Sequence, residues 1–231
     1  MMSRSMAPSG DLGLRLIKGG LGIEPQAQIP LAQVVRRGFP IRGLDAEVSA
    51  YRCRNLFKLL RGLKPVLLAR ALGIPTFYGM LELLKIDGLT GERIDYGLVG
   101  MRVVTTAGIT YIAADIAGGA SDSNLFKFHG IGTGNTAEAV GDTALVTELT
   151  TEYNPNSTRA TGTQSSSAGV YTTPGTNTLD SGTPAIVEHG VFTATSAGTL
   201  LDRTVFSAIN LTGASADSLL STYALTLVAG S

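Results

Sequence analysis

The chain contains two histidines, His129 and His189, which are its best candidates for acid–base chemistry. His189 directly follows Glu188 in a segment whose alternating pattern predicts a strand. Neighbouring residues of a strand point to opposite faces, so the Glu188 carboxylate cannot orient the His189 ring. A nucleophilic Ser or Thr would need both a base and a group that orients that base. We therefore expect structural roles for both histidines and no catalytic residue.

The sequence contains few residues suited to binding a metal ion or a cofactor. The single cysteine, Cys53, excludes a disulfide framework and a cysteine-rich zinc site. Two histidines leave little for a histidine-based metal site. We expect neither a metal ion nor a cofactor.

Paired carboxylates could act on a glycosidic bond. The candidates are scattered among predicted loops and polar strand faces: Asp142, Glu148, Glu152, Asp202 and Asp217. The chain has no Trp and only 6% aromatic residues, so few rings could stack on a sugar. An enzyme is therefore the least favoured class of function.

A glycine-rich segment at 130–138, GIGTGNTAE, superficially resembles a phosphate-binding loop. A P-loop needs a Lys after its last Gly, because the ammonium group reaches the phosphates, and this segment has no Lys. The dinucleotide-binding pattern G-x-G-x-x-G also fails, because Asn135 stands where the third Gly belongs. We predict a turn-rich loop without a ligand.

The elements that would position any site fall into two chemically different halves. Residues 1–95 hold 14 Lys and Arg against 8 Asp and Glu, whereas residues 96–231 hold 4 against 10. Only 2 Thr precede residue 96, and 24 follow it. Because Thr is β-branched, it suits a half-exposed strand. We predict a basic N-terminal region over 1–95 and a Thr-rich β domain over 96–231.

The first 50 residues are predicted to form an extended arm. Prolines and glycines recur through this segment and disfavour a continuous helix. No apolar stripe in it is long enough for a core, so we expect the arm to become ordered against a partner surface. Its predicted docking stripe combines apolar residues with arginines: Leu31, Val34, Val35, Arg36, Arg37, Phe39, Ile41, Arg42 and Leu44.

Residues 51–72 are the strongest helix candidate, and they are expected to dock with the arm. Their apolar residues recur at i, i+3, i+4 and i+7: Leu56, Leu59, Leu60 and Leu63. Pro65 should break or kink this helix. A second short helix is predicted over about 76–84, ending at the Asp87-Gly88 turn. Because the 51–72 helix is basic, contact with nucleic acid or a membrane surface is a weaker alternative to packing against protein.

From residue 96 the hydrophobic period drops to two, which predicts strands. The first two, 97–106 and 109–116, should form a hairpin around Ala107-Gly108. Seven more strands are predicted at 123–132, 144–153, 159–164, 168–173, 185–195, 199–211 and 218–230, with a serine-rich loop at 165–167. About nine strands without intervening helices predict a mainly β fold. We expect an antiparallel β-sandwich or jelly-roll-like domain, preceded by an extended, partly helical arm.

The segment at 129–153, HGIGTGNTAEAVGDTALVTELTTEY, has a more specific character. It resembles a family of small virion structural proteins of tailed bacteriophages, together with TRATGTQ at 158–164, IVEHGVF at 186–192, GTLLDRTVFSAINL at 198–211 and DSLLSTYALTLVAG at 217–230. The resemblance covers about residues 97–231 and involves strand and turn patterns rather than catalytic signatures. Residues 1–95 match nothing in that family.

The resemblance implies an oligomeric β domain on a phage particle, and head decoration (cement) proteins are the preferred members of that setting. Such proteins clamp neighbouring major capsid subunits on the outside of the head, commonly as homotrimers. The implied partners are the major capsid protein and further copies of this chain, and no direct contact with nucleic acid or membrane is expected. The implied location is the capsid exterior, after assembly in the host cytoplasm.

Other functions stay open on this sequence. A tail, baseplate or fibre-base component would share the β domain and the phage setting. A glycan-binding adhesin would use exposed loops such as 154–168. A membrane protein is not expected, because charged residues and prolines interrupt the most hydrophobic region, 56–84.

Overall fold

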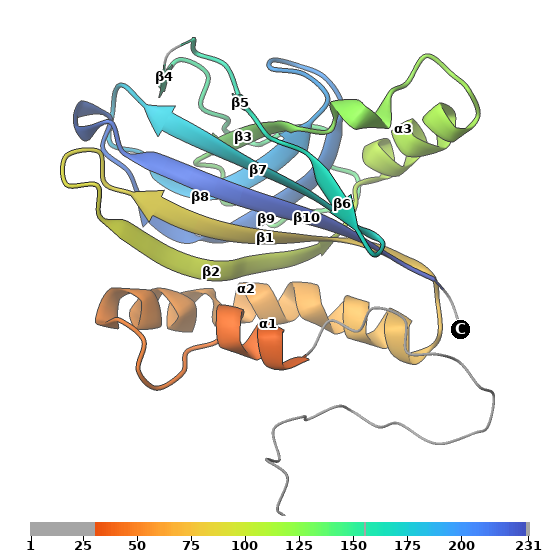
Figure 1. The fold of residues 1–231 in the computed structure, drawn as a ribbon, viewed down its shortest axis with the longest axis horizontal. Helices are drawn as coiled ribbons and strands as arrows, with labels where there is room; N and C mark the ends of the chain where they lie inside the picture. The colour runs from red at the N-terminus through yellow and green to blue at the C-terminus, as the bar shows by residue number, and fades with distance from the viewer. Residues whose placement is uncertain (1–30, 155, 230–231) are drawn as a thin grey trace, which may run out of the picture.

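The computed structural model describes residues 31–154 and 156–229 of the 231. Two antiparallel sheets face each other there, with helices along one side and at one end (Figure 1). Sheet A has the strand order β2-β1-β10-β7-β4, with β6 paired to β7, and sheet B has the order β5-β3-β8-β9. The predicted mainly β, sandwich-like character is therefore confirmed.

The helices and strands alternate irregularly along the chain. The helices are α1 (Leu31–Gly38), α2 (Ala46–Ala71) and α3 (Thr106–Ile116), with short 3₁₀ turns η1 (Ser123–Leu125) and η2 (Gly213–Ser215). The strands are β1 (Thr76–Ile86), β2 (Arg93–Val103), β3 (Phe128–Gly132), β4 (Tyr153–Asn154), β5 (Ala160–Thr161), β6 (Ser165–Ser167), β7 (Val170–Leu179), β8 (Ala185–Phe192), β9 (Leu200–Asn210) and β10 (Ser218–Val228).

Sheet A joins strands that lie far apart in the sequence. β10 pairs with β1 along its whole length, from Ser218 opposite Ile86 to Val228 opposite Thr76, and its other edge pairs with β7. The predicted boundary between residues 95 and 96 falls inside β2, so it is wrong as a division of the fold. The charge and the Thr content change within one continuous sheet, because β1 and β2 belong to the same sheet as β7 and β10.

One segment predicted as a helix is a strand in the structure, and one segment predicted as a strand is a helix. The segment predicted as a helix over 76–84 is strand β1, because β2 and β10 pair with both of its edges. The segment predicted as a strand over 109–116 belongs to helix α3. Thr105 caps this helix by accepting a hydrogen bond from Gly108 N, so the predicted hairpin turn at Ala107-Gly108 is the first helical turn.

The helix predicted over 51–72 is confirmed as α2, which begins earlier than expected. Asp45 caps it by accepting hydrogen bonds from Glu47 N and Val48 N. The helix continues past Pro65, so the predicted break is wrong. The arm is not extended over 31–50, because α1 and the first turn of α2 lie there. The rest of the predicted arm, 1–30, lies outside the described residues.

The later strands are predicted better than the earlier ones. β8, β9 and β10 fall within their predicted segments. In contrast, 123–132 holds a strand only from Phe128, and 144–153 is almost entirely irregular. The serine segment 165–167, predicted as a loop, pairs with β7 as β6.

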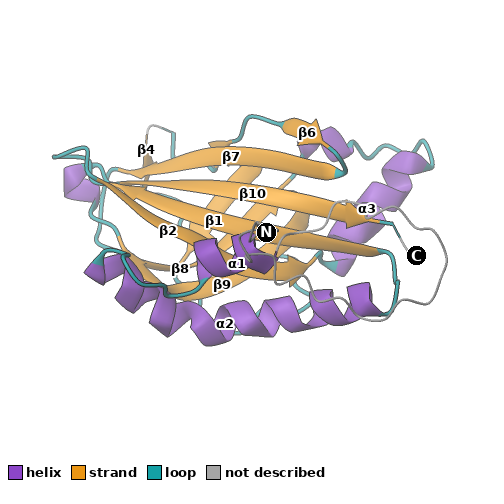
Figure 2. Ribbon diagram, turned by 60° about the horizontal axis from the view of Figure 1, so that its bottom comes forward, coloured by secondary structure: helices purple, strands orange, loops and turns teal. Residues whose placement is uncertain are grey.

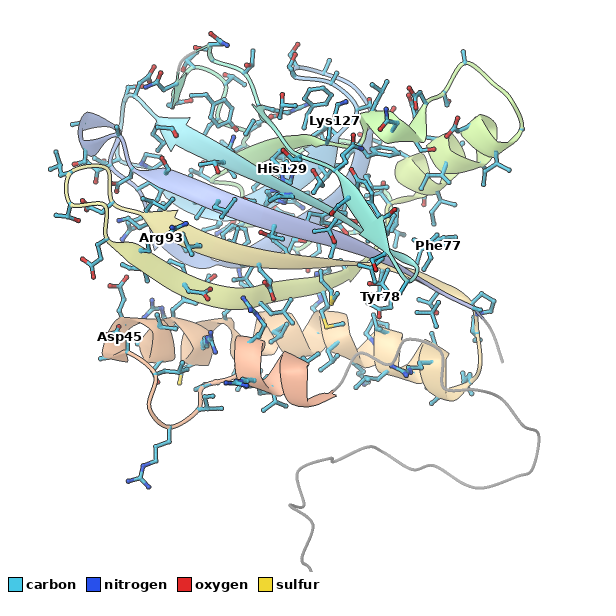
Figure 3. The ribbon with its side chains drawn as sticks, in the orientation of Figure 1. Asp45, Phe77, Tyr78, Arg93, Lys127 and His129 are labelled. Carbon is cyan, nitrogen blue, oxygen red and sulfur yellow. The ribbon has the colours of Figure 1, made fainter. Side chains whose placement is uncertain are left out.

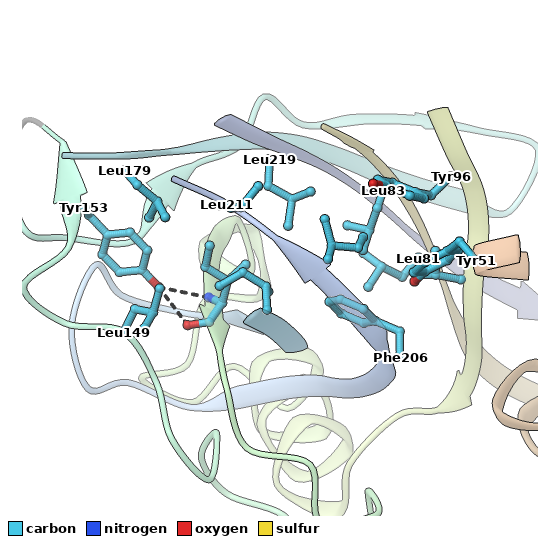
Figure 4. Close-up of a cluster of buried hydrophobic side chains, with 14 residues drawn as sticks. Tyr51, Leu81, Leu83, Tyr96, Leu149, Tyr153, Leu179, Phe206, Leu211 and Leu219 are labelled. Atoms are coloured by element: carbon cyan, nitrogen blue, oxygen red, sulfur yellow. Dashed lines mark hydrogen bonds between the residues drawn. The ribbon is translucent and has the colours of Figure 1, made fainter. Parts of the chain in front are cut away.

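The main core fills the space between the sheets (Figure 4). Leu81 and Leu219 come from sheet A, and Ile131 and Phe206 come from sheet B. Tyr153 fixes one end of this core, because its hydroxyl accepts from the backbone N–H of Ile131 and donates to the carbonyl of the same residue. A second apolar cluster lies between sheet A and the helices α1 and α2.

Candidate interaction surface

Helix α2 lies across the seam where the edge strands β2 and β9 meet (Figure 2). Asn55 joins both edges: its Nδ2 donates to Val99 O at 2.7 Å, and its Oδ1 accepts from Ser207 N at 2.9 Å. Lys58 Nζ donates to Phe206 O at 3.0 Å. These side chains satisfy backbone groups that edge strands leave unpaired. The helix is therefore a built-in part of the sandwich.

Two further contacts fix the helices on sheet A. Gly62 lies so close to the Met101 carbonyl oxygen that a Cβ at this position would lie 1.6 Å from it. Arg52 is buried and donates to Tyr96 O at 3.2 Å and to Arg36 O at 3.0 Å. A cation at the carboxyl end of a helix satisfies its free carbonyl groups. One side chain therefore ties α1, α2 and β2 together.

Some residues of the predicted docking stripe face the protein's own sheet. Val34, Leu59 and Leu63 are buried, so they cannot meet a partner in this fold, and the prediction is wrong for these three. Their apolar spacing was identified correctly, but the surface that they cover belongs to the same chain. They pack against Tyr78 on β1 and against Leu98 and Met101 on β2. Figure 3 shows Tyr78 on the sheet above these helices.

The other predicted docking residues lie toward the outside. Leu56, Phe39 and Leu44 are half-buried. Leu31 begins α1, and its side chain lies outside the description. Arg37 Nε forms an ion pair with Glu82 at 2.6 Å. Six residues of the predicted set are exposed: Val35, Arg36, Arg37, Ile41, Arg42 and Leu60.

The outward side of α2 carries exposed apolar side chains, of which the sequence predicts only Leu60 as a docking residue. Phe57 is 82% exposed, and Leu67, nearly three helical turns further along α2, is also exposed. The i, i+3, i+4, i+7 spacing singles out the stripe from Leu56 to Leu63, and Phe57 and Leu67 do not belong to it. We call this surface the α2 outer face: Phe57, Leu60 and Leu67, with the exposed cations Arg54, Arg61 and Lys64.

Both histidines are fully buried rather than at a cleft, and Figure 3 shows the position of His129 between the sheets. His129 Nδ1 is 3.0 Å from His189 Nε2, and its Nε2 is 3.3 Å from Thr173 Oγ1. Burial lowers the pKa of His129 to about 4. Burial, and then the neighbouring His129, lower the pKa of His189 well below its usual value. The pair is neutral near pH 7 and holds β3, β8 and β7 together.

Glu188 points away from His189, as their adjacent positions predicted, and organises the glycine-rich loop. Its carboxylate accepts from Gly134 N at 3.0 Å and Thr147 N at 2.8 Å, and Arg203 Nε donates to it at 2.8 Å. Within the loop, the Gly134 amide therefore faces a carboxylate of the same chain rather than a phosphate.

The carboxylates considered for glycosidase chemistry all make internal contacts. Glu148 forms a two-pronged ion pair with Arg159, with distances of 2.5 and 2.7 Å. Asp202 is buried, and burial raises its pKa to about 6. The remaining contacts join Asp142 to Arg203, Asp217 to Lys85, and Glu152 to the backbone of residues 150 and 151.

Further candidate sites are few in the part of the chain that the structure describes. Among its residues, His, Cys, Asp and Glu form no group of three or more that could hold a metal ion. No helix in residues 31–154 and 156–229 is long and apolar enough to cross a membrane. A cavity of about 130 Å³ beside α2 is lined by Arg102 and Glu138, which form an ion pair with each other.

No family model matches this chain. A search of curated proteins gives no match either. The function therefore has to be argued from the surfaces that the fold presents, and the α2 outer face is the most distinctive of those described here.

Proposed function

We propose that the protein is a head decoration (cement) protein of a phage particle, which docks on the major capsid protein through the α2 outer face. The observation that carries this proposal is an exposed apolar stripe, flanked by cations, on a helix that the fold holds firmly. Apolar side chains that gather on a surface with polar neighbours are typical of protein interaction sites.

The rigidity of α2 favours binding. Asn55 and Arg52 attach the helix to both edges of the sandwich, so its outer face is ordered before a partner arrives. A surface that is already ordered loses less conformational entropy on association. This arrangement revises the docking mechanism expected from the sequence, because the described part of the arm is a fixed element of the sandwich.

The cations give the surface a preference for its partner. Arg54, Arg61 and Lys64 are exposed beside Phe57 and Leu60. Positive charges at the rim of an interface steer the protein toward an acidic surface and fix its orientation. A shell with acidic outer surfaces would fit this face, and clamping neighbouring subunits would stabilise the head.

Shell binding can be tested with the double substitution Phe57→Glu/Arg61→Glu in the full chain. The protein is mixed with capsids that lack it, and the bound fraction is measured by co-sedimentation. We expect affinity to fall by at least about tenfold, because both the central apolar anchor and a rim charge are lost. The thermal unfolding midpoint should stay close to that of the wild type, since both side chains are exposed.

A matched control uses Leu89→Glu in the β1–β2 turn, because Leu89 is 79% exposed and lies away from α2. This variant should bind like the wild type. Wild-type occupancy by the Phe57→Glu/Arg61→Glu variant would overturn the proposed docking surface. Antibody labelling of particles tests the location, because label confined to the tail would favour a tail or fibre-base component instead.

A further inference from the structure

An acidic, apolar projection stands at one end of the sandwich. We call residues 106–125 the α3 knob, because α3 and η1 project there beyond the sheets (Figure 1). Ile116 is 83% exposed, and Ile109 is also exposed. The only charged side chains of the knob are Asp115 and Asp122. The knob therefore presents apolar side chains in a negatively charged setting.

A basic, apolar surface lies where α2 leads into β1. We call this surface the end patch: Leu68, Leu72, Ile74, Phe77 and Leu227, all of them exposed. Phe77 and Leu227 are direct cross-strand partners on β1 and β10, so their side chains are neighbours. Arg70 and Lys64 lie on the same stretch of α2. The end patch therefore has the charge opposite to that of the knob.

We propose that the α3 knob of one copy of this chain docks on the end patch of a second copy. Both surfaces are apolar, and their charges are complementary, which favours contact and correct orientation. Pairing two end patches would bring Arg70 and Lys64 close to their own copies. Pairing two knobs would bring Asp115 and Asp122 together. Like charges in contact disfavour both symmetric arrangements.

The contact joins two different surfaces. Two copies can exchange knob and patch reciprocally across a two-fold axis. A single, heterologous contact instead leaves one free knob and one free patch on the pair, so further copies add and close into a ring when the rotation between copies permits. Its apolar residues lie outside the α2 outer face, and the contact shares only the cation Lys64 with that face. It therefore does not depend on the proposed capsid role.

The test uses two single variants of the full chain, each examined by sedimentation velocity. Ile116→Arg alters the knob and leaves the patch intact. Leu72→Glu alters the patch at a side chain that is 64% exposed, and it leaves the knob intact. We expect the wild type to self-associate and each variant alone to be monomeric. Mixed in equal amounts, the two variants should form a one-to-one dimer that grows no further, because one intact knob meets one intact patch.

Circular dichroism melts check that both variants fold, and Leu89→Arg serves as a control that should self-associate like the wild type. A monomeric wild type, or a variant that associates alone, overturns the proposal. Association of the Ile116→Arg variant alone would indicate patch-to-patch pairing, and a mixture that stays monomeric would exclude the heterologous contact. None of these results changes the shell-binding test, which rests on Phe57 and Arg61.

Discussion

The two sheets are held together differently on their two sides. On the β2–β9 side, α2 spans the seam and Asn55 bonds to both edges. On the opposite side, β7 meets β3 and β5 around the buried pair His129 and His189, with Thr173 beside it. Amide hydrogen bonds do not titrate, whereas imidazoles do. The Asn55 bonds across the helix side are therefore indifferent to mild acid, and the histidine side is where acid weakens the sandwich.

The largest effect is expected on the helix side from Gly62→Val. Its Cβ would lie 1.6 Å from the Met101 carbonyl oxygen, so α2 cannot stay seated on β2. We expect a loss of more than about 3 kcal/mol in the free energy of unfolding, measured by urea titration. Gly141→Val is the control, since a Cβ there meets no atom within 4 Å. Equal stability of the two variants would mean that α2 does not hold the seam.

A smaller loss is expected from Asn55→Leu. This change leaves Val99 O and Ser207 N without their side-chain partner in a buried place. Two unsatisfied backbone groups should cost about 3 kcal/mol in the free energy of unfolding. The exposed Asn135 provides the control Asn135→Leu, which should cost little. An Asn55→Leu variant as stable as this control would contradict the bridging role.

Because of the buried histidine pair, we expect the free energy of unfolding to fall in mild acid. Both histidine pKa values are lowered in the fold, so the unfolded chain takes up protons first, and stability is lost as the pH falls from about 6.5 toward 4. The raised pKa of Asp202 acts in the opposite direction and offsets part of this loss. We expect the free energy of unfolding to be about 2 kcal/mol lower at pH 5 than at pH 7.

The double variant His129→Leu/His189→Leu separates this effect from other titrations. Without the imidazoles, the decline between pH 7 and pH 5 should disappear or reverse, because the contribution of Asp202 then stands alone. The same urea titrations at the two pH values measure it. An unchanged decline would show that other groups cause the loss of stability. It would contradict the proposal that the two sides of the sandwich differ in their sensitivity to acid.

The smallest effect is expected from Gly175→Ala on the histidine side. A Cβ there would lie 2.4 Å from His129 Cδ2, so the ring must shift. Because a side chain moves more easily than the backbone that opposes Gly62, we expect a loss of about 1–2 kcal/mol in the free energy of unfolding. Gly141→Ala is the matched control. A loss as large as that of Gly62→Val would show that both sides are equally rigid.

Local pattern predicts the last three strands, although they differ in their surroundings. Buried and half-buried residues alternate along most of β10, whereas β8 and β9 are buried on both faces for most of their length and have short apolar runs instead. The two segments whose types were predicted wrongly had ambiguous short patterns, and distant residues decided them. β1 is a strand because β10 pairs with it from the far end of the sequence. α3 is a helix because Thr105 caps it and Gly108 packs closely against Leu201.

The candidate surface was predicted only in part for a related reason. The stripe containing Leu59 and Leu63 revealed a face that must be covered, but periodicity does not say what covers it. The covering surface includes Leu98 on β2, in a segment assigned to a separate domain. Phe57 was visible in the sequence as an apolar residue on the opposite helical face. Its exposure to a partner follows only from the structure, which places the opposite face of the helix against the sheet.

The position of β10 between β1 and β7 also constrains biosynthesis. Every other described strand leaves the ribosome before this one, so sheet A stays split into two parts with open edges until β10 is made. Such edges invite pairing with other chains. The nascent protein therefore depends on a late, long-range insertion step, and a chain truncated before residue 218 should aggregate rather than accumulate as a shorter soluble domain.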